Sequence, residues 1–207
     1  MCQFLSAIVL KNGDVLHEPL LDSHSDLVAH FGLPDTTAHH QHFAKVELTP
    51  PADWIGWEDL SKWTFRLDEE TVPGWWDDVK VGAEESVRNI IRRAILPAGE
   101  QPFLLDGLAL IGPGVVVRSI RGGRSVIWGG TVSEICGGTV SAICGGTVSE
   151  IWGGTVSAIC GGTVSEIKKY PGWNAPVILA VAKGVKLNKG ARQFIARKAA
   201  PKRKPVK

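Results

Sequence analysis

The sequence contains few cysteines and no long hydrophobic segment. Four cysteines are spread over 207 residues without a CxxC pair, and three of them occupy equivalent places in a repeat. This spacing supports neither a zinc site nor a disulfide framework, so we expect no metal or cofactor and a reducing compartment, the cytoplasm. No apolar run approaches the ~18 residues of a membrane span. The segment Met1–Leu10 also lacks the basic flank of a signal peptide.

Acidic residues are missing from the last part of the chain. From Ile167 to Lys207 the sequence has twelve Lys or Arg and no Asp or Glu, a net charge of +12. The remaining residues include 11 basic and 21 acidic side chains, a net charge of −10. The overall charge of +2 therefore conceals an acidic body and a basic C-terminal segment.

What the chain does contain is a repeat. Five near-identical octads run without interruption from Gly129 to Lys168: GGTVSEIC, GGTVSAIC, GGTVSEIW, GGTVSAIC and GGTVSEIK. A fixed period is typical of one structural unit stacked on copies of itself. A glycine pair in every octad disfavours helix, whereas Thr, Val and Ile favour strands. Each octad is therefore predicted to form a short strand and a turn.

The sixth octad position alternates between Glu and Ala, so the complete period is sixteen residues. In a two-sided β-solenoid, each coil uses two octads, and the Glu and Ala positions lie on different walls. In an antiparallel β-meander with Gly-Gly turns, the glutamates also share one face, because reversal exchanges the faces of successive strands. We favour the solenoid, since in-register stacking rewards identical side chains, and keep the meander as the alternative.

Weaker features flank the octads on both sides. Two degenerate copies, Gly114–Arg121 and Gly122–Trp128, are expected to form a capping rung at the start of the stack. Pro176–Lys183 is predicted to be a strand that closes its other end.

The octads also carry a resemblance. Runs such as GGTVSEI resemble the GGTV-x-x-[VI]-x octapeptide repeats of small uncharacterised proteins from actinobacterial phages and prophages. The resemblance covers Gly129–Lys168. It implies a solenoid-like segment in an accessory viral protein, and it supplies no catalytic residues.

Residues before the repeat predict a small α+β domain. A hairpin is expected around Asn12-Gly13, and a short helix is expected after Ser23. Further strands are predicted at Phe43–Leu48 and Lys62–Asp68, followed by a long amphipathic helix from Trp76 to Leu96. We therefore divide the chain into an α+β domain (1–100), a repeat region with caps (101–183) and a basic helix with a disordered tail (184–207).

Tryptophan is abundant in the acidic half. Trp63 alternates with polar residues in a predicted strand and is expected in the core. Four others flank acidic loops, and exposed tryptophans among acids are typical of protein-binding hot spots. These candidates are Trp54, Trp57, Trp75 and Trp76. The alternative is that the rings fill the core of a small domain.

Catalytic and metal-binding candidates are few. Removal of Met1 would expose Cys2 as an N-terminal nucleophile, but no glycine-rich segment follows it, and we interpret it as the start of an edge strand. His39, His40 and His42 lack metal-binding spacing and are predicted to lie in a solvated loop. We therefore predict no enzyme, and an amidohydrolase of the N-terminal-nucleophile type is an alternative.

The basic C-terminal segment can bind phosphate groups. Without interleaved aromatic residues, such binding would be independent of nucleic-acid sequence. The candidate residues are Lys189, Arg192, Arg197, Lys198, Lys202, Arg203 and Lys204. The alternatives are a solubilising tail, or a tail that pairs with the acidic body of the same protein.

Together these features predict a non-enzymatic, phage-derived binding protein. The acidic Trp-rich domain and the solenoid would engage a host or viral protein, with no membrane contact. Exposed strand edges in the stack also favour a homo-oligomer. Nucleic-acid binding by the basic segment is the alternative function.

Overall fold

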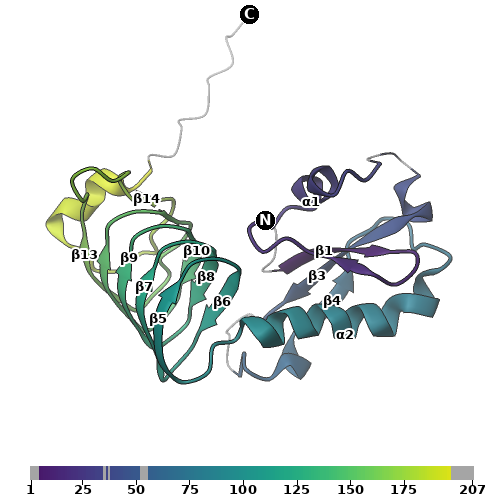
Figure 1. Cartoon of the computed structure of the whole chain (residues 1–207), viewed down its shortest axis with the longest axis horizontal. Coiled ribbons are helices and arrows are strands. Elements are labelled where there is room, and N and C mark those ends of the chain that lie inside the picture. Colours follow the sequence, from purple (N-terminus) through teal and green to yellow (C-terminus); the bar gives the residue numbers. More distant parts are fainter. Residues whose placement is uncertain (1–4, 35, 37, 52–55, 197–207) are drawn as a thin grey trace, which may run out of the picture. The chain divides into compact units, whose positions relative to one another are not determined.

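The computed structural model describes residues 5–34, 36, 38–51 and 56–196 (Figure 1). The chain divides into two compact units, residues 1–95 and 96–207, and each is described by itself. The division lies a few residues before the boundary near residue 100 that the sequence indicated. The difference arises because the first solenoid strand already begins at Gly99, ahead of the recognisable repeat.

The first unit is built on a four-stranded antiparallel sheet with the order β2-β1-β3-β4. Its strands are β1 (Leu5–Leu10), β2 (Val15–Leu16), β3 (Phe43–Thr49) and β4 (Thr64–Leu67). The predicted hairpin joins β1 and β2 through Gly13, whose φ is 90°. The amide of Leu10 donates to the carbonyl of Asp14 at 2.8 Å and closes the turn. The α+β domain expected from the sequence is confirmed.

Two α-helices and two short 3-10 helices accompany this sheet. They are α1 (His24–His30), η1 (His39–Gln41), η2 (Leu60–Lys62) and α2 (Trp76–Ala94). The side chain of Ser23 caps α1, as predicted, by accepting from the amide of Asp26 at 3.5 Å. On α2 the buried face includes Ile91, whereas the neighbouring Ile90 is only half-buried. Within the described ranges, no helix combines the length and apolarity that a membrane crossing requires.

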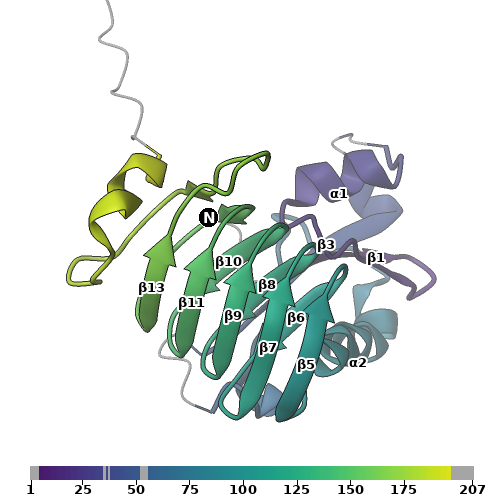
Figure 2. The same cartoon turned by 60° about the vertical axis from the view of Figure 1, so that its left-hand side comes forward.

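The second unit is a two-walled parallel β-solenoid (Figure 2). The odd wall contains β5 (Gly99–Leu104), β7 (Val115–Ile120), β9 (Thr131–Ile135), β11 (Thr147–Ile151) and β13 (Thr163–Ile167). The even wall contains β6 (Leu108–Ile111), β8 (Arg124–Ile127), β10 (Thr139–Ile143), β12 (Thr155–Val156) and β14 (Val177–Ile178). Every pairing between these strands is parallel. The solenoid is confirmed, and the antiparallel meander is wrong.

In the octad coils, the interior of the solenoid is formed by the Val and Ile of each octad. All ten of these side chains are at most 4 % exposed. The Val and Ile lie three residues apart, and strict alternation would place them on opposite faces of a strand. Both nevertheless face the interior, and the pairing between neighbouring strands is interrupted at the serine between them, so Ser and the sixth residue are less buried. Burial of each such side chain contributes about 1.5–3 kcal/mol.

The glycine pair is required where successive coils touch. At Gly145 an added Cβ would lie 2.3 Å from the carbonyl oxygen of Trp128 in the preceding coil. At Gly146 the φ is 70°, a conformation that L side chains rarely adopt. Thus the first glycine permits close stacking and the second permits the turn.

The coil formed by β5 and β6 was not predicted from the sequence, since its spacing departs from eight residues. The degenerate copies Gly114–Arg121 and Gly122–Trp128 form most of β7 and β8, so they belong to the second coil and do not cap the stack. The copy Gly122–Trp128 has seven residues, and the pairing of β8 with β10 accordingly shifts by one residue after Val140.

The end of the solenoid is covered by the segment that follows β13. The predicted strand Pro176–Lys183 is present as β14 and a separate bridge at Val181. A 3-10 helix, η3 (Lys189–Phe194), lies within the segment 184–207 in which a basic helix was expected. Its Ala191 is fully buried, and Phe194 packs against the solenoid core. The described part of the basic segment therefore forms a cap.

Candidate functional site

The odd wall carries a column of three glutamates. Glu134, Glu150 and Glu166 pair in register from β9 through β11 to β13. Neighbouring rungs of a parallel sheet are about 4.8 Å apart, so the carboxylates form one closely spaced acidic row. The alternating alanines Ala142 and Ala158 belong to the even side, as the sixteen-residue period predicted.

A lysine from the same chain neutralises one end of this column. The ammonium group of Lys168 donates to Glu166 at 3.0 Å and to Glu150 at 3.1 Å. These hydrogen bonds, first to Glu166 and then to Glu150, raise the pKa of Lys168 above its ordinary value. The same ammonium lies 5.3 Å from the ring centre of Trp152, within the range of a cation–π interaction. The column therefore already holds one cationic side chain.

Three aromatic rings lie beside the column. Trp152 stacks on Tyr170 with ring centres 5.1 Å apart, and Tyr170 meets Trp173 edge-on at 5.7 Å. Tyr170 is 44 % exposed and Trp173 is 43 % exposed. The indole N–H of Trp152 is buried and has no acceptor among the described residues. We call Glu134, Glu150, Glu166, Trp152, Tyr170 and Trp173 the aromatic–acidic wall.

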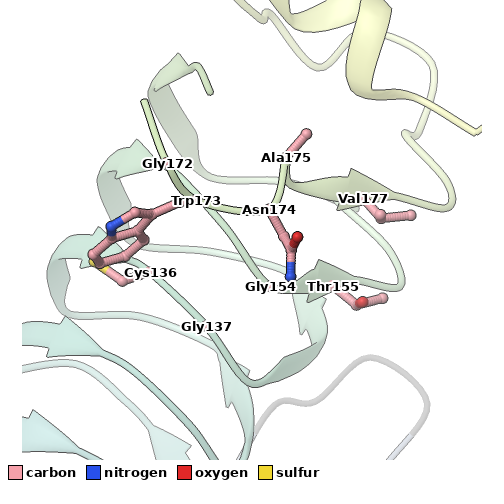
Figure 3. Close-up of a pocket in the computed structure, with 9 residues that line it drawn as sticks. All are labelled: Cys136, Gly137, Gly154, Thr155, Gly172, Trp173, Asn174, Ala175 and Val177. Atoms are coloured by element: carbon pink, nitrogen blue, oxygen red, sulfur yellow. The ribbon is translucent and has the colours of Figure 1, made fainter. Parts of the chain in front are cut away.

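A shallow hollow of about 560 Å³ adjoins this wall (Figure 3). Trp173 and Cys136 both line it, and the side chain of Asn174 extends toward Gly154 and Thr155. Glycines line much of the remaining surface, so the backbone of two coils is accessible there. The hollow thus offers a ring, an amide and a hydroxyl to a bound segment.

Two thiols of the solenoid, those of Cys136 and Cys144, are poor nucleophiles. Burial raises the pKa of Cys136, whose thiol donates to Glu134 at 3.6 Å. Burial, followed by the neighbouring Cys160, raises the pKa of Cys144 to about 12. A thiol that stays protonated at neutral pH does not attack an electrophile readily.

Two of the four tryptophans predicted to bind a partner are buried. Trp57 and Trp76 are each only 4 % exposed, so the expectation of exposed rings is wrong for both. The physical reason is that a small domain fills its core with large rings. Trp75 is half-buried, and its indole donates to the carbonyl of His40 at 3.0 Å. Trp54 lies outside the described residues.

The three neighbouring histidines do not form a ligand set. His39 and His40 lie in η1, and His42 directly follows it. His39 is largely buried and binds the carboxylate of Glu69 at 2.9 Å, with its other ring nitrogen 2.8 Å from the carbonyl of Thr36. The structure instead brings His24 near two carboxylates, Glu47 and Asp68.

The predicted phosphate-binding residues are only partly described. Arg192 is exposed on η3, in the cap of the solenoid, and Lys189 begins η3. The others lie outside the described residues: Arg197, Lys198, Lys202, Arg203 and Lys204. Cys2 also lies outside them.

Sequence reasoning missed the aromatic–acidic wall. The sequence feature that could have indicated it is the eighth position of the octads. This position is cysteine in three octads, whereas Trp152 and Lys168 occupy it in the other two. These two residues and Cys136 are sixteen residues apart and so occupy one column of the solenoid. Tyr170 and Trp173 join them only because the chain leaving β13 returns beside this column.

The fold defines a β-solenoid protein, and the candidate site is a row of aligned glutamates beside three aromatic rings. No known protein-family model, curated protein or solved structure shows significant similarity to the chain.

Proposed function

We propose that this protein is a non-enzymatic interaction protein whose aromatic–acidic wall binds a basic, extended segment of a host or viral protein partner. The observation that carries the proposal is the position of Lys168. Its ammonium contacts two glutamates and the face of Trp152. A lysine or arginine of a partner can make the same contacts farther along the column.

The charge of the wall favours a cationic ligand. Three glutamates stand in one row, and Lys168 bonds to only two of them. Like charges in one row repel each other, and a bound cation relieves that repulsion. The half-exposed rings of Tyr170 and Trp173 add apolar surface and cation–π attraction. This proposal moves the interaction surface from the Trp-rich domain to the solenoid.

A labelled peptide of alternating Lys and Arg residues tests the proposal by fluorescence anisotropy. We expect the double substitution Glu134→Gln with Glu150→Gln to weaken binding about tenfold, since each exposed ion pair contributes up to ~1 kcal/mol. Lys168→Met should strengthen binding, because it removes the internal cation that competes for the same carboxylates. Trp173→Ala should weaken it by removing the ring.

Glu85→Gln is the matched control, because Glu85 is an exposed carboxylate on α2 in the other unit. It changes the net charge of the protein without touching the wall, so the affinity should stay unchanged. If Glu85→Gln lowers the peptide affinity as much as Glu134→Gln or Glu150→Gln alone, the attraction depends only on the net charge of the protein. That result would contradict the proposal.

The basic cap supports a second candidate function, sequence-independent binding of nucleic acid. Lys183, Lys186 and Arg192 are exposed there, and no acidic residue occurs after Glu166. This function predicts an affinity for duplex DNA that falls steeply with salt. Truncation after Ala196 removes the remaining basic cluster and keeps the described cap. DNA affinity that survives this truncation would refute a role for that cluster.

A further inference from the structure

We propose that His24, Glu47 and Asp68 form a binding site for one divalent transition-metal ion of the zinc type. The site lies in the first unit and is independent of the aromatic–acidic wall. His24 begins α1, Glu47 lies within β3, and Asp68 directly follows β4. One potential ligand atom from each residue lies within 4.8 Å of the other two.

The orientation of the His24 ring indicates that its Nδ1 can bind a metal ion. Its Nε2 lies 3.0 Å from the carbonyl oxygen of Val46, and a carbonyl only accepts hydrogen bonds, so Nε2 carries the proton. In the neutral ring, Nδ1 then presents a lone pair. This lone pair faces a carboxylate oxygen of Asp68 at 3.2 Å. Two acceptors at that distance require a cation between them, either a second proton on the ring or a metal ion.

The surroundings favour the metal ion. A histidine that binds a metal commonly donates its other ring N–H to a backbone carbonyl, which fixes the ring and its tautomer. The bond from His24 to Val46 has this arrangement. The side chains of His24 and Glu47 are only 10 % and 5 % exposed, so two of the three ligands are held in place by packing. Asp68 is 41 % exposed and leaves a path for entry.

Arg66 lies next to the site without closing it. Its guanidinium donates to Glu47 at 2.6 Å and lies 3.6 Å from Asp68. The side chain of Arg66 is 50 % exposed and can move toward solvent, while a bound cation would neutralise the buried Glu47 in its place. Each carboxylate also has two oxygens, and Glu47 can bind an ion through one of them and retain Arg66 on the other.

The donor set selects the class of ion. One imidazole nitrogen and two carboxylate oxygens give three protein ligands and leave a fourth position for water. Imidazole suits Zn²⁺ and its first-row neighbours, whereas Mg²⁺ and Ca²⁺ prefer oxygen ligands alone. The expected occupant is therefore Zn²⁺ or a similar ion such as Co²⁺. Bound there, it would connect α1 to β3 and to the end of β4.

Calorimetric titration of the chelator-treated full chain with ZnCl₂ tests this site. We expect one site per chain, with an affinity at least tenfold lower in His24→Gln and in Asp68→Asn. A glutamine can retain the hydrogen bond to Val46 while removing the ligand nitrogen. Asp68→Asn is nearly isosteric and half-exposed, so it decides the question if His24→Gln fails to fold by circular dichroism.

His39→Gln is the matched control, because His39 also pairs with a buried carboxylate, that of Glu69. It should leave Zn²⁺ affinity unchanged. Co²⁺ provides a second probe that separates this site from the thiols, since nitrogen and oxygen ligands give no thiolate charge-transfer band. Absence of stoichiometric binding, or binding that neither Asp68→Asn nor His24→Gln weakens, would overturn the proposal and identify His24 as a protonated partner of Asp68.

Discussion

Glycine is the residue type that most strictly determines the solenoid. We predict that Gly145→Ala destabilises the protein by about 2 kcal/mol or more, because the new Cβ would overlap the backbone of the preceding coil. The free energy of unfolding in urea measures this effect. At Gly82, in the exposed part of α2, an added Cβ meets nothing within 4 Å. Gly82→Ala should therefore stabilise the protein by roughly 0.5–1 kcal/mol. Equal effects of the two substitutions would contradict this account of the glycine pairs.

At the same scale, thiol reactivity should differ between neighbouring coils. The pKa of Cys144, raised by burial to about 12, keeps its thiol protonated at pH 8, whereas Cys160 is exposed. In variants that each retain one of these cysteines as the sole thiol, Cys144 should react with iodoacetamide more than tenfold more slowly. Because the folded state raises this pKa, the rate should climb as the pH approaches 12. Equal rates at pH 8 would show that Cys144 is not shielded.

At the scale of secondary structure elements, the period of sixteen residues makes a direct prediction about deletions. Removal of Gly129–Cys144 deletes one complete coil and keeps every later strand on its own wall. We expect this variant to fold with a small loss of stability, since each coil contacts mainly its neighbours.

Removal of Gly137–Cys144 alone deletes one octad and transfers each later strand to the opposite wall. Glu150 would then leave the glutamate column, and the cap with Ala191 and Phe194 would meet the wrong side of the stack. Loss of these buried contacts should cost about 3 kcal/mol more than the sixteen-residue deletion. Thermal unfolding compares the two variants, and a more stable eight-residue deletion would contradict the two-walled description.

The elements that the sequence predicted well are those with a local signal. The octads, the hairpin at Asn12-Gly13 and the long helix α2 all follow from spacing and turn residues, and the glutamates share one wall as expected. The coil of β5 and β6 lacks the octad spacing, and the burial of Trp57 and Trp76 depends on packing between distant segments. The His24 cluster was missed because its three ligands come from three separate elements.

At the scale of the whole molecule, charge separates along the chain. The last 41 residues carry +12 and the preceding part carries −10, so two opposite binding functions are available to one protein. The glutamate column belongs to the acidic part, and the exposed cap residues Lys183, Lys186 and Arg192 belong to the basic part. Opposite charges on one chain also favour association between copies of the protein. Because salt screens this attraction, peptide binding must be compared at low and high salt.

The most direct measurement of the proposed function follows the indole N–H resonances of the eight tryptophans by ¹⁵N NMR as the Lys-Arg peptide is added. Assignment by Trp152→Phe and Trp173→Phe identifies the two signals from the wall. Binding at the aromatic–acidic wall predicts that these two resonances shift together, with the buried Trp57, Trp63 and Trp76 unchanged. Peptide binding that leaves Trp152 and Trp173 unshifted would place the interaction elsewhere and contradict the account.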